Sequence, residues 1–146
     1  MTIRKSITVA RPPEIAFRVF TEEIGRWWPL KQGFSFGRER AQDIIIEGRQ
    51  GGRFFERFTD GTEFEVGRVT TFQPPEVIRL TWKAPDWEGS TDIEVRFVAE
   101  GGGTRVELEH RGFEQSPKMS ETGKRYDGGW NVIFASYVSH LGRIDR

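Results

Sequence analysis

The longest helical pattern of apolar residues lies near the C-terminus of the chain. Between Gly128 and Leu141, in GGWNVIFASYVSHL, large apolar side chains recur at intervals of three and four residues: Trp130, Ile133, Phe134, Tyr137, Val138 and Leu141. Residues at this spacing share one stripe of an α-helix, and a stripe this wide is typical of a buried face. The pattern therefore predicts a terminal helix that packs against another layer.

The middle of the chain has the pattern of an antiparallel sheet. Segments rich in β-branched and aromatic residues are separated by Gly-Gly, Asp-Gly and Pro-Pro turn signals. Because short connections favour antiparallel neighbours, we expect consecutive strands to pair. The predicted strands are residues 42–48, 52–58, 63–72, 77–84, 91–99 and 104–111.

Alternation identifies the buried face of the last three strands. The predicted inward residues are Ile78, Leu80, Trp82, Ile93, Val95, Phe97, Val106, Leu108 and His110. Charged residues occupy most of the alternate positions, as expected for a solvated face. In strands 52–58 and 63–72 both phases carry apolar and charged residues, so the pattern leaves their facing open.

The N-terminal segment predicts a strand, two short helices and an aromatic loop. Ile3, Ile7 and Val9 frame the strand, and Pro13 favours the start of a helix because a first-turn residue needs no N–H partner. The second helix should end before Pro29, since the residue preceding proline avoids the helical region. The predicted helices are residues 13–20 and 22–28, and the loop is residues 30–40, which contains Phe34 and Phe36.

Composition narrows the class of protein. The length of 146 residues suits one domain, and equal numbers of basic and acidic residues, 22 each, argue against a nucleic-acid binder or a polybasic membrane anchor. Twelve Phe and five Trp favour a core or cavity lined by aromatic rings. The absence of cysteine and of a long apolar run makes the cytoplasm the expected location.

The sequence offers little support for metal or cofactor chemistry. Two histidines far apart in the chain, with no cysteine, make a zinc or iron site unexpected. The chain has no GxSxG elbow, no GxxxxGK[ST] loop and no GxGxxG at the start of a helix. We therefore expect no metal and no cofactor.

Four stretches together resemble the START-like (SRPBCC) superfamily, in the branch named for the activator of heat-shock-protein-90 ATPase homologue. They are PPEIAFRVFTEEIGRWWP, GRQGGRFFERFTDGTEFEVGRVTTFQPPEVIRLTW, GGGTRVELEHRGFE and GGWNVIFASYVSHL, in the expected order over nearly the whole chain. The resemblance implies an α+β helix-grip fold in one domain, residues 1–146. In this fold a curved seven-stranded antiparallel sheet holds the long C-terminal helix across its concave face.

The resemblance also implies a cavity between the sheet and the terminal helix. The leading interpretation is that this cavity binds a small, mostly hydrophobic molecule. The expected ligand-binding residues are Trp28, Trp82, Phe97, His110, Trp130, Phe134 and Tyr137. Each of these rings is also consistent with ordinary core packing, and Trp27 or Trp28 is expected to cap the core while the other lies at the cavity mouth.

Two groups of polar residues have alternative roles. His110 is a weak catalytic candidate as a general acid or base, and a structural role in the HRGF stretch is at least as well supported. Glu56, Glu63, Glu65 and Arg68 form either a polar group inside the cavity or, preferably, a cross-strand ladder of ion pairs on the solvated face. His140 is expected to be solvated near the C-terminus of the helix.

Two other classes of function remain open. An enzyme of the cyclase, dehydratase or hydrolase type would use the same cavity through His110 or a carboxylate. A co-chaperone-like interaction module would require an exposed apolar patch or charged groove and a filled interior. The expected partner is a hydrophobic small molecule, with no nucleic acid and no membrane insertion. A homodimer is left open by the aromatic loop, and a chaperone partner has no support in the sequence.

Overall fold

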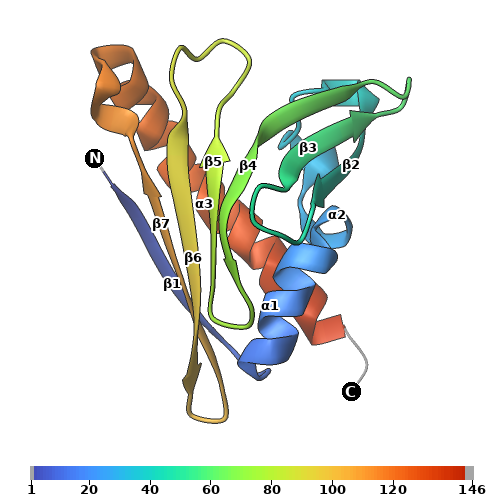
Figure 1. The fold of residues 1–146 in the computed structure, drawn as a ribbon, viewed down its shortest axis with the longest axis vertical. Helices are drawn as coiled ribbons and strands as arrows, with labels where there is room; N and C mark the ends of the chain where they lie inside the picture. The colour runs from blue at the N-terminus through green and yellow to red at the C-terminus, as the bar shows by residue number, and fades with distance from the viewer. Residues whose placement is uncertain (1, 144–146) are drawn as a thin grey trace.

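The computed structural model describes residues 2–143 and contains a seven-stranded antiparallel sheet crossed by one long helix (Figure 1). Neighbouring strands follow the order β1-β7-β6-β5-β4-β3-β2, so every chain-adjacent pair from β2 to β7 is also adjacent in the sheet. β1 pairs with β7 and completes the sheet. The strands are β1 (Ile3–Val9), β2 (Ala41–Ile46), β3 (Arg53–Phe58), β4 (Glu63–Gln73), β5 (Val77–Trp82), β6 (Thr91–Glu100) and β7 (Gly103–Arg111).

The helices agree with the predicted order. α1 (Pro13–Glu22) and α2 (Ile24–Trp27) follow β1, and the terminal helix α3 is the last element. Within the aromatic segment expected as an irregular loop, the structure contains two single 3₁₀ turns, η1 (Leu30–Gln32) and η2 (Arg38–Arg40). A third, η3 (Phe113–Gln115), connects β7 to α3.

Helix α3 (Pro117–Arg143) begins eleven residues before the predicted start at Gly128. Ser116 precedes it, and its hydroxyl accepts a hydrogen bond from the backbone N–H of Met119 at 3.1 Å, which satisfies one of the free donors of the first turn. Pro117 occupies the first helical position, where no N–H partner is needed. The extra turns extend the helix over the half of the sheet that carries the pocket described below.

Aromatic rings fill the part of the sheet–helix interface next to α1. Phe20 contacts Tyr137 with ring centroids 5.3 Å apart, and Trp27 contacts the same tyrosine at 5.1 Å. On the sheet side, Phe97 contacts Phe17 at 5.1 Å. The Tyr137 hydroxyl donates a hydrogen bond to the carbonyl oxygen of Ala16 at 2.7 Å, which fixes α3 against α1.

Two expectations for α3 were wrong. Val138 was placed on the buried stripe but is 40 % exposed, since it lies at the margin of the face that contains Tyr137 and Leu141. His140 was expected in solvent, yet its side chain is only 16 % exposed. Its Nε2 atom lies 2.9 Å from Oε1 of Glu23, at the junction of α1 and α2, so this histidine ties the end of α3 to the N-terminal helices.

Strands β3 and β4 were ambiguous because each violates simple alternation. In β3 the outward Phe55 is buried beneath the guanidinium of Arg53, whose carbon lies 3.9 Å from the ring centroid, whereas the inward position carries Glu56. In β4 the pairing register shifts on both sides, so Val66 and Val69 are both buried although they are three residues apart. These β-bulges change the facing of the strand.

Candidate functional site

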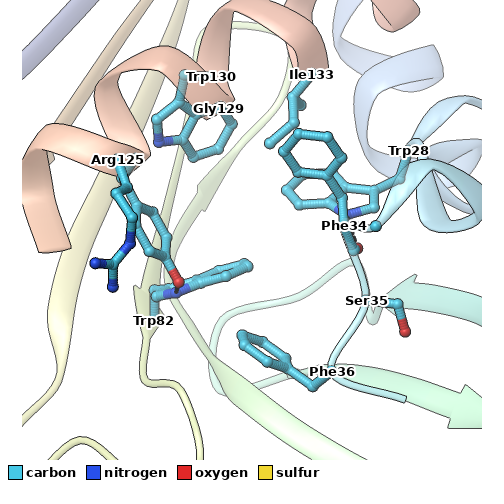
Figure 2. Close-up of a pocket in the computed structure, with 11 residues that line it drawn as sticks. Trp28, Phe34, Ser35, Phe36, Trp82, Arg125, Gly129, Trp130 and Ile133 are labelled. Carbon is cyan, nitrogen blue, oxygen red and sulfur yellow. Dashed lines mark hydrogen bonds between the residues drawn. The ribbon is translucent and has the colours of Figure 1, made fainter. Parts of the chain in front are cut away.

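A hollow of about 400 Å³ lies beneath α3, beyond the filled part of the interface (Figure 2). Residues from α3, from the end of β5 and from the segment that follows α2 surround it. Most of its lining consists of aromatic rings, as is typical of sites for apolar ligands. The lining residues are Trp28, Gly33, Phe34, Ser35, Phe36, Trp82, Arg125, Tyr126, Gly129, Trp130 and Ile133.

The three tryptophans of the lining use their indole N–H groups inside the protein. Trp28 donates to the carbonyl oxygen of Phe34 at 2.9 Å, and Trp82 donates to the Tyr126 hydroxyl at 3.0 Å. Trp130 donates to Nδ1 of His110 at 3.0 Å. Each hydrogen bond fixes the orientation of its ring, so the tryptophans are held in place and offer mainly carbon surface to the hollow.

His110 lies behind this lining and is fully buried. Because Nδ1 accepts from Trp130, the network assigns the ring proton to Nε2, which donates to the Thr91 hydroxyl at 2.7 Å. Thr91 in turn donates to the carbonyl oxygen of Trp82 at 2.9 Å. Burial lowers the pKa of His110 from 6.5 to about 3, so the imidazole is neutral at physiological pH. The histidine thus connects two lining residues.

Glu56 holds the loop that forms the opposite side of the hollow. Its Oε2 atom accepts the backbone N–H of Phe36 at 3.0 Å, and its Oε1 atom accepts the Ser35 hydroxyl. Ser35 also accepts the N–H of Gly37 at 3.0 Å. Burial raises the pKa of Glu56, while the hydrogen bonds from Phe36 and Ser35 lower it in part. The carboxylate therefore positions Phe34 and Phe36 as lining residues.

Gly129 keeps the helix side of the hollow open. A Cβ atom at this position would meet only the Phe34 ring, at 3.4 Å, so larger side chains would project toward the loop. Glycine in a helix interior costs about 1 kcal/mol relative to alanine. The adjacent Gly128 is exposed, and nothing lies within 4 Å of its Cβ position.

Two polar groups of the lining, Tyr126 and Arg125, lie on one side of the hollow. Tyr126 accepts from Trp82, and burial raises its pKa to about 12, so its hydroxyl keeps its proton. Arg125 is exposed at the margin, and its positive charge favours the ionised tyrosine without overcoming the effect of burial. Figure 2 shows Arg125 on the side of the hollow where Trp82 lies, away from Phe34 and Ser35.

The structure brings together three of the seven predicted ligand-binding residues. Trp28, Trp82 and Trp130 line the hollow, whereas Phe97, His110, Phe134 and Tyr137 lie outside its lining. Phe34 and Phe36 had been noted only as loop aromatics. The sequence analysis missed Arg125 and Tyr126 because it placed the start of the terminal helix too late, and it missed Gly129, which lies within the predicted helix, because it considered only large apolar side chains there.

The remaining polar candidates lie elsewhere. Glu63 and Glu65 form exposed ion pairs with arginines: Arg53 reaches Glu63 at 2.8 Å, and Arg68 reaches Glu65 at 2.9 Å. Within residues 2–143, no cluster of His, Asp and Glu could hold a metal ion, and no helix is both long and apolar enough to cross a membrane.

Solved structures show that this architecture recurs. A protein from Mesorhizobium loti has 18 % identity and a TM-score of 0.76, with both chains covered completely. An Aha1 dimer from Colwellia psychrerythraea has 20 % identity and a TM-score of 0.66, covering 93 % of this chain and 92 % of that one. At these identities the likeness establishes the fold.

The anthrahydroquino-γ-pyrone synthase Txn09 is more similar in sequence. It has 32 % identity and a TM-score of 0.60, covering 94 % of this chain and 95 % of the synthase. Comparison with curated protein sequences found no match. The family described as activator of Hsp90 ATPase homolog 1-like protein matches residues 10–142. This match spans nearly all of the sequence, and the chain belongs to that family.

Proposed function

We propose that the protein binds a small, mostly hydrophobic molecule in the hollow beneath α3. The observation that carries this proposal is the ring-lined space of about 400 Å³ between the helix and the loop that contains Phe34 and Phe36. Apolar pockets with a few polar groups at one side are typical small-molecule sites. The ligand-binding residues in this proposal include Trp28, Trp82 and Trp130.

A protein-interaction role has less support. It was expected to combine a filled interior with an exposed apolar patch or a charged groove. Among the described residues, the exposed large hydrophobic side chains are three valines, Val98 on β6 and Val132 and Val138 on α3. Phe34 and Phe36, the reason for which a homodimer was left open, are half-buried and line the hollow. A homodimer therefore stays a prediction.

An enzyme that uses the same pocket is the second candidate. The 32 % identity to a synthase supports it. In this case Tyr126 is the better placed proton donor, because it lines the hollow while His110 is bonded at both ring nitrogens. A molecule retained from the host and released for liquid chromatography with mass spectrometry distinguishes the two candidates: an enzyme converts it on incubation to a product of different mass or retention time, whereas a carrier returns it unchanged.

A larger side chain on the helix side of the hollow tests whether the hollow is the binding site. Gly129→Leu places a branched side chain toward Phe34 inside the hollow, while Gly128→Leu makes the same change at the exposed neighbouring position. Titration with 2-naphthamide, a neutral aromatic probe, can be followed by tryptophan fluorescence because three tryptophans line the site. We expect the Gly129 variant to lose binding and the Gly128 variant to bind as the unmodified protein does.

Circular dichroism and thermal unfolding show whether both variants are folded. Equal binding by the two folded variants, or no binding by the unmodified protein, would contradict the proposed site.

A further inference from the structure

We infer that the ligand is a flat aromatic compound with an anionic oxygen group, such as a carboxylate, and that Arg125 and Tyr126 bind this group at the mouth of the hollow. The inference rests on the proposed function and adds a substrate class to it. It also assigns the selectivity for charge to one residue, Arg125.

The argument begins with the groups that are already occupied. Trp28, Trp82 and Trp130 each donate the indole N–H to a protein acceptor. Ser35 is likewise engaged, because it donates to Glu56 and accepts from Gly37. A bound molecule therefore meets ring faces and edges over most of the site, and ring surfaces favour flat aromatic partners.

Two donors of the lining remain available. The Tyr126 hydroxyl accepts from Trp82, and within residues 2–143 the structure assigns no acceptor to its own proton. The Arg125 guanidinium has no carboxylate partner in the described part of the chain. Both groups donate, so they complement an oxygen acceptor, and a guanidinium prefers a negatively charged one.

Arg125 is informative because it borders the hollow: other exposed arginines, such as Arg26 and Arg38, also form no ion pair within residues 2–143, but neither lines this site. On the outer face of the sheet, Arg53, Arg79 and Arg105 all contact carboxylates. On α3 itself, Lys124 pairs with Glu121 at 3.1 Å. Arg125 is instead next to an apolar hollow, where a guanidinium has no structural partner. Asp86 is the acidic group whose charge reaches Tyr126, but it lies outside the lining.

The test compares 2-naphthoate with 2-naphthamide, which have the same ring system and differ in charge at neutral pH. We expect the naphthoate to bind more tightly and the difference to shrink as salt is added. Arg125→Gln should weaken naphthoate binding by about tenfold, the lower end for a charge-assisted hydrogen bond at an exposed site. Naphthamide binding should change little, and Arg125→Lys should recover part of the loss.

Lys124→Gln is the matched control, because it removes one positive charge from the adjacent helical position without touching the lining. It should leave both affinities unchanged. Equal affinities for the two probes in the unmodified protein, or equal losses from the Arg125 and Lys124 variants, would overturn the inference and leave the apolar site standing. Failure of both probes to bind would instead overturn the proposed function.

Discussion

His110 links two lining tryptophans through hydrogen bonds at both of its ring nitrogens. Trp130 reaches Nδ1 directly, and Nε2 reaches the backbone of Trp82 through Thr91. An imidazole bonded in this way has no free nitrogen for a substrate. Its contribution is to orient the rings that a ligand would contact, and this requires the neutral form.

Burial of the neutral imidazole makes stability depend on pH. The pKa of His110 falls from 6.5 in the unfolded chain to about 3 in the folded protein. At a pH between these two values the unfolded state therefore binds more protons than the folded state does. The free energy of unfolding should therefore decrease as the pH falls below 6.5, with a slope of up to about 1.4 kcal/mol per pH unit from this residue.

Urea unfolding of the unmodified protein and of His110→Gln across this range isolates the effect, since glutamine can accept from Trp130 and donate to Thr91 without titrating. Glu56 titrates with the opposite sign, because its raised pKa favours the folded state at lower pH, and it is common to both proteins. Parallel curves for the two proteins would mean that His110 is not the group responsible.

At the scale of elements, a single side chain of β3 connects the loop from Gly33 to Gly37 to the sheet by hydrogen bonds, while Trp28 holds the loop from the other side at the Phe34 carbonyl. The buried carboxylate of Glu56, which is 2 % exposed, bonds Ser35 and the backbone of Phe36. The loop has only single 3₁₀ turns on either side of it. Its position against the hollow therefore follows from Glu56 and from the packing of its aromatic rings.

Removal of this carboxylate should release the loop. Glu56→Ala leaves the Phe36 N–H and the Ser35 hydroxyl without their partner and should lower the free energy of unfolding by about 2 kcal/mol. Hydrogen exchange at the Phe36 amide should accelerate, and naphthamide binding should weaken. Glu56→Gln serves as the control, because its amide oxygen can accept from the Phe36 N–H while its amide nitrogen donates to the Ser35 hydroxyl oxygen in place of the present bond. An Ala variant with unchanged exchange at Phe36 would show that packing alone holds the loop.

The sequence predicted the elements best where one face is uniformly apolar. The alternation in β6 and β7 identified the inward residues Ile93, Val95 and Leu108, all of which are buried. The same method failed for β3, because Glu56 faces inward and Phe55 is covered from outside by Arg53. Only the three-dimensional structure shows that the partners of Glu56 are Ser35 and Phe36, which lie 21 and 20 residues earlier in the chain.

The site was predicted in part for a related reason. The inward stripe of α3 continues upstream of Trp130. Tyr126 lies four residues before this tryptophan, and Thr122 and Met119 extend the stripe further toward the start of the helix. Gly123, Gly128 and Gly129 interrupt the helical pattern and obscured it. The Ser116-Pro117 start signal was present in the sequence and would have placed Arg125 and Tyr126 on the helix.

At the scale of the whole molecule, the interface between the sheet and α3 has two parts, one filled by side chains and one hollow. Phe17, Phe20 and Tyr137 pack in the first, while Phe36 and Trp82 line the second. Fixed rings next to α1 anchor α3, and the helix then extends over the open half as a rigid cover. Phe17, Phe20 and Tyr137 therefore contribute to stability without lining the hollow, whereas the buried Trp28, Trp82 and Trp130 belong to both the core and the lining.

One substitution at two positions tests this division. Phe20→Leu removes ring contacts with Trp27, Phe97 and Tyr137 and should lower the free energy of unfolding by roughly 1–2 kcal/mol, with little effect on naphthamide binding. Phe36→Leu should have the reverse profile, with weaker binding and a smaller change in stability, because its ring is only half-buried. The same pattern from both variants would contradict the division.

Because the filled half anchors α3, homologous proteins can differ in sequence around the hollow. Substitutions of Phe34, Phe36 and Arg125 leave unchanged the ring contacts and the hydrogen bond by which Tyr137 anchors α3, so these lining positions can change with little cost in stability. We expect homologous chains to vary most at the positions of Phe34, Phe36 and Arg125, and least at those of Phe20 and Tyr137. One scaffold can thereby acquire many ligand preferences through a small number of residue exchanges.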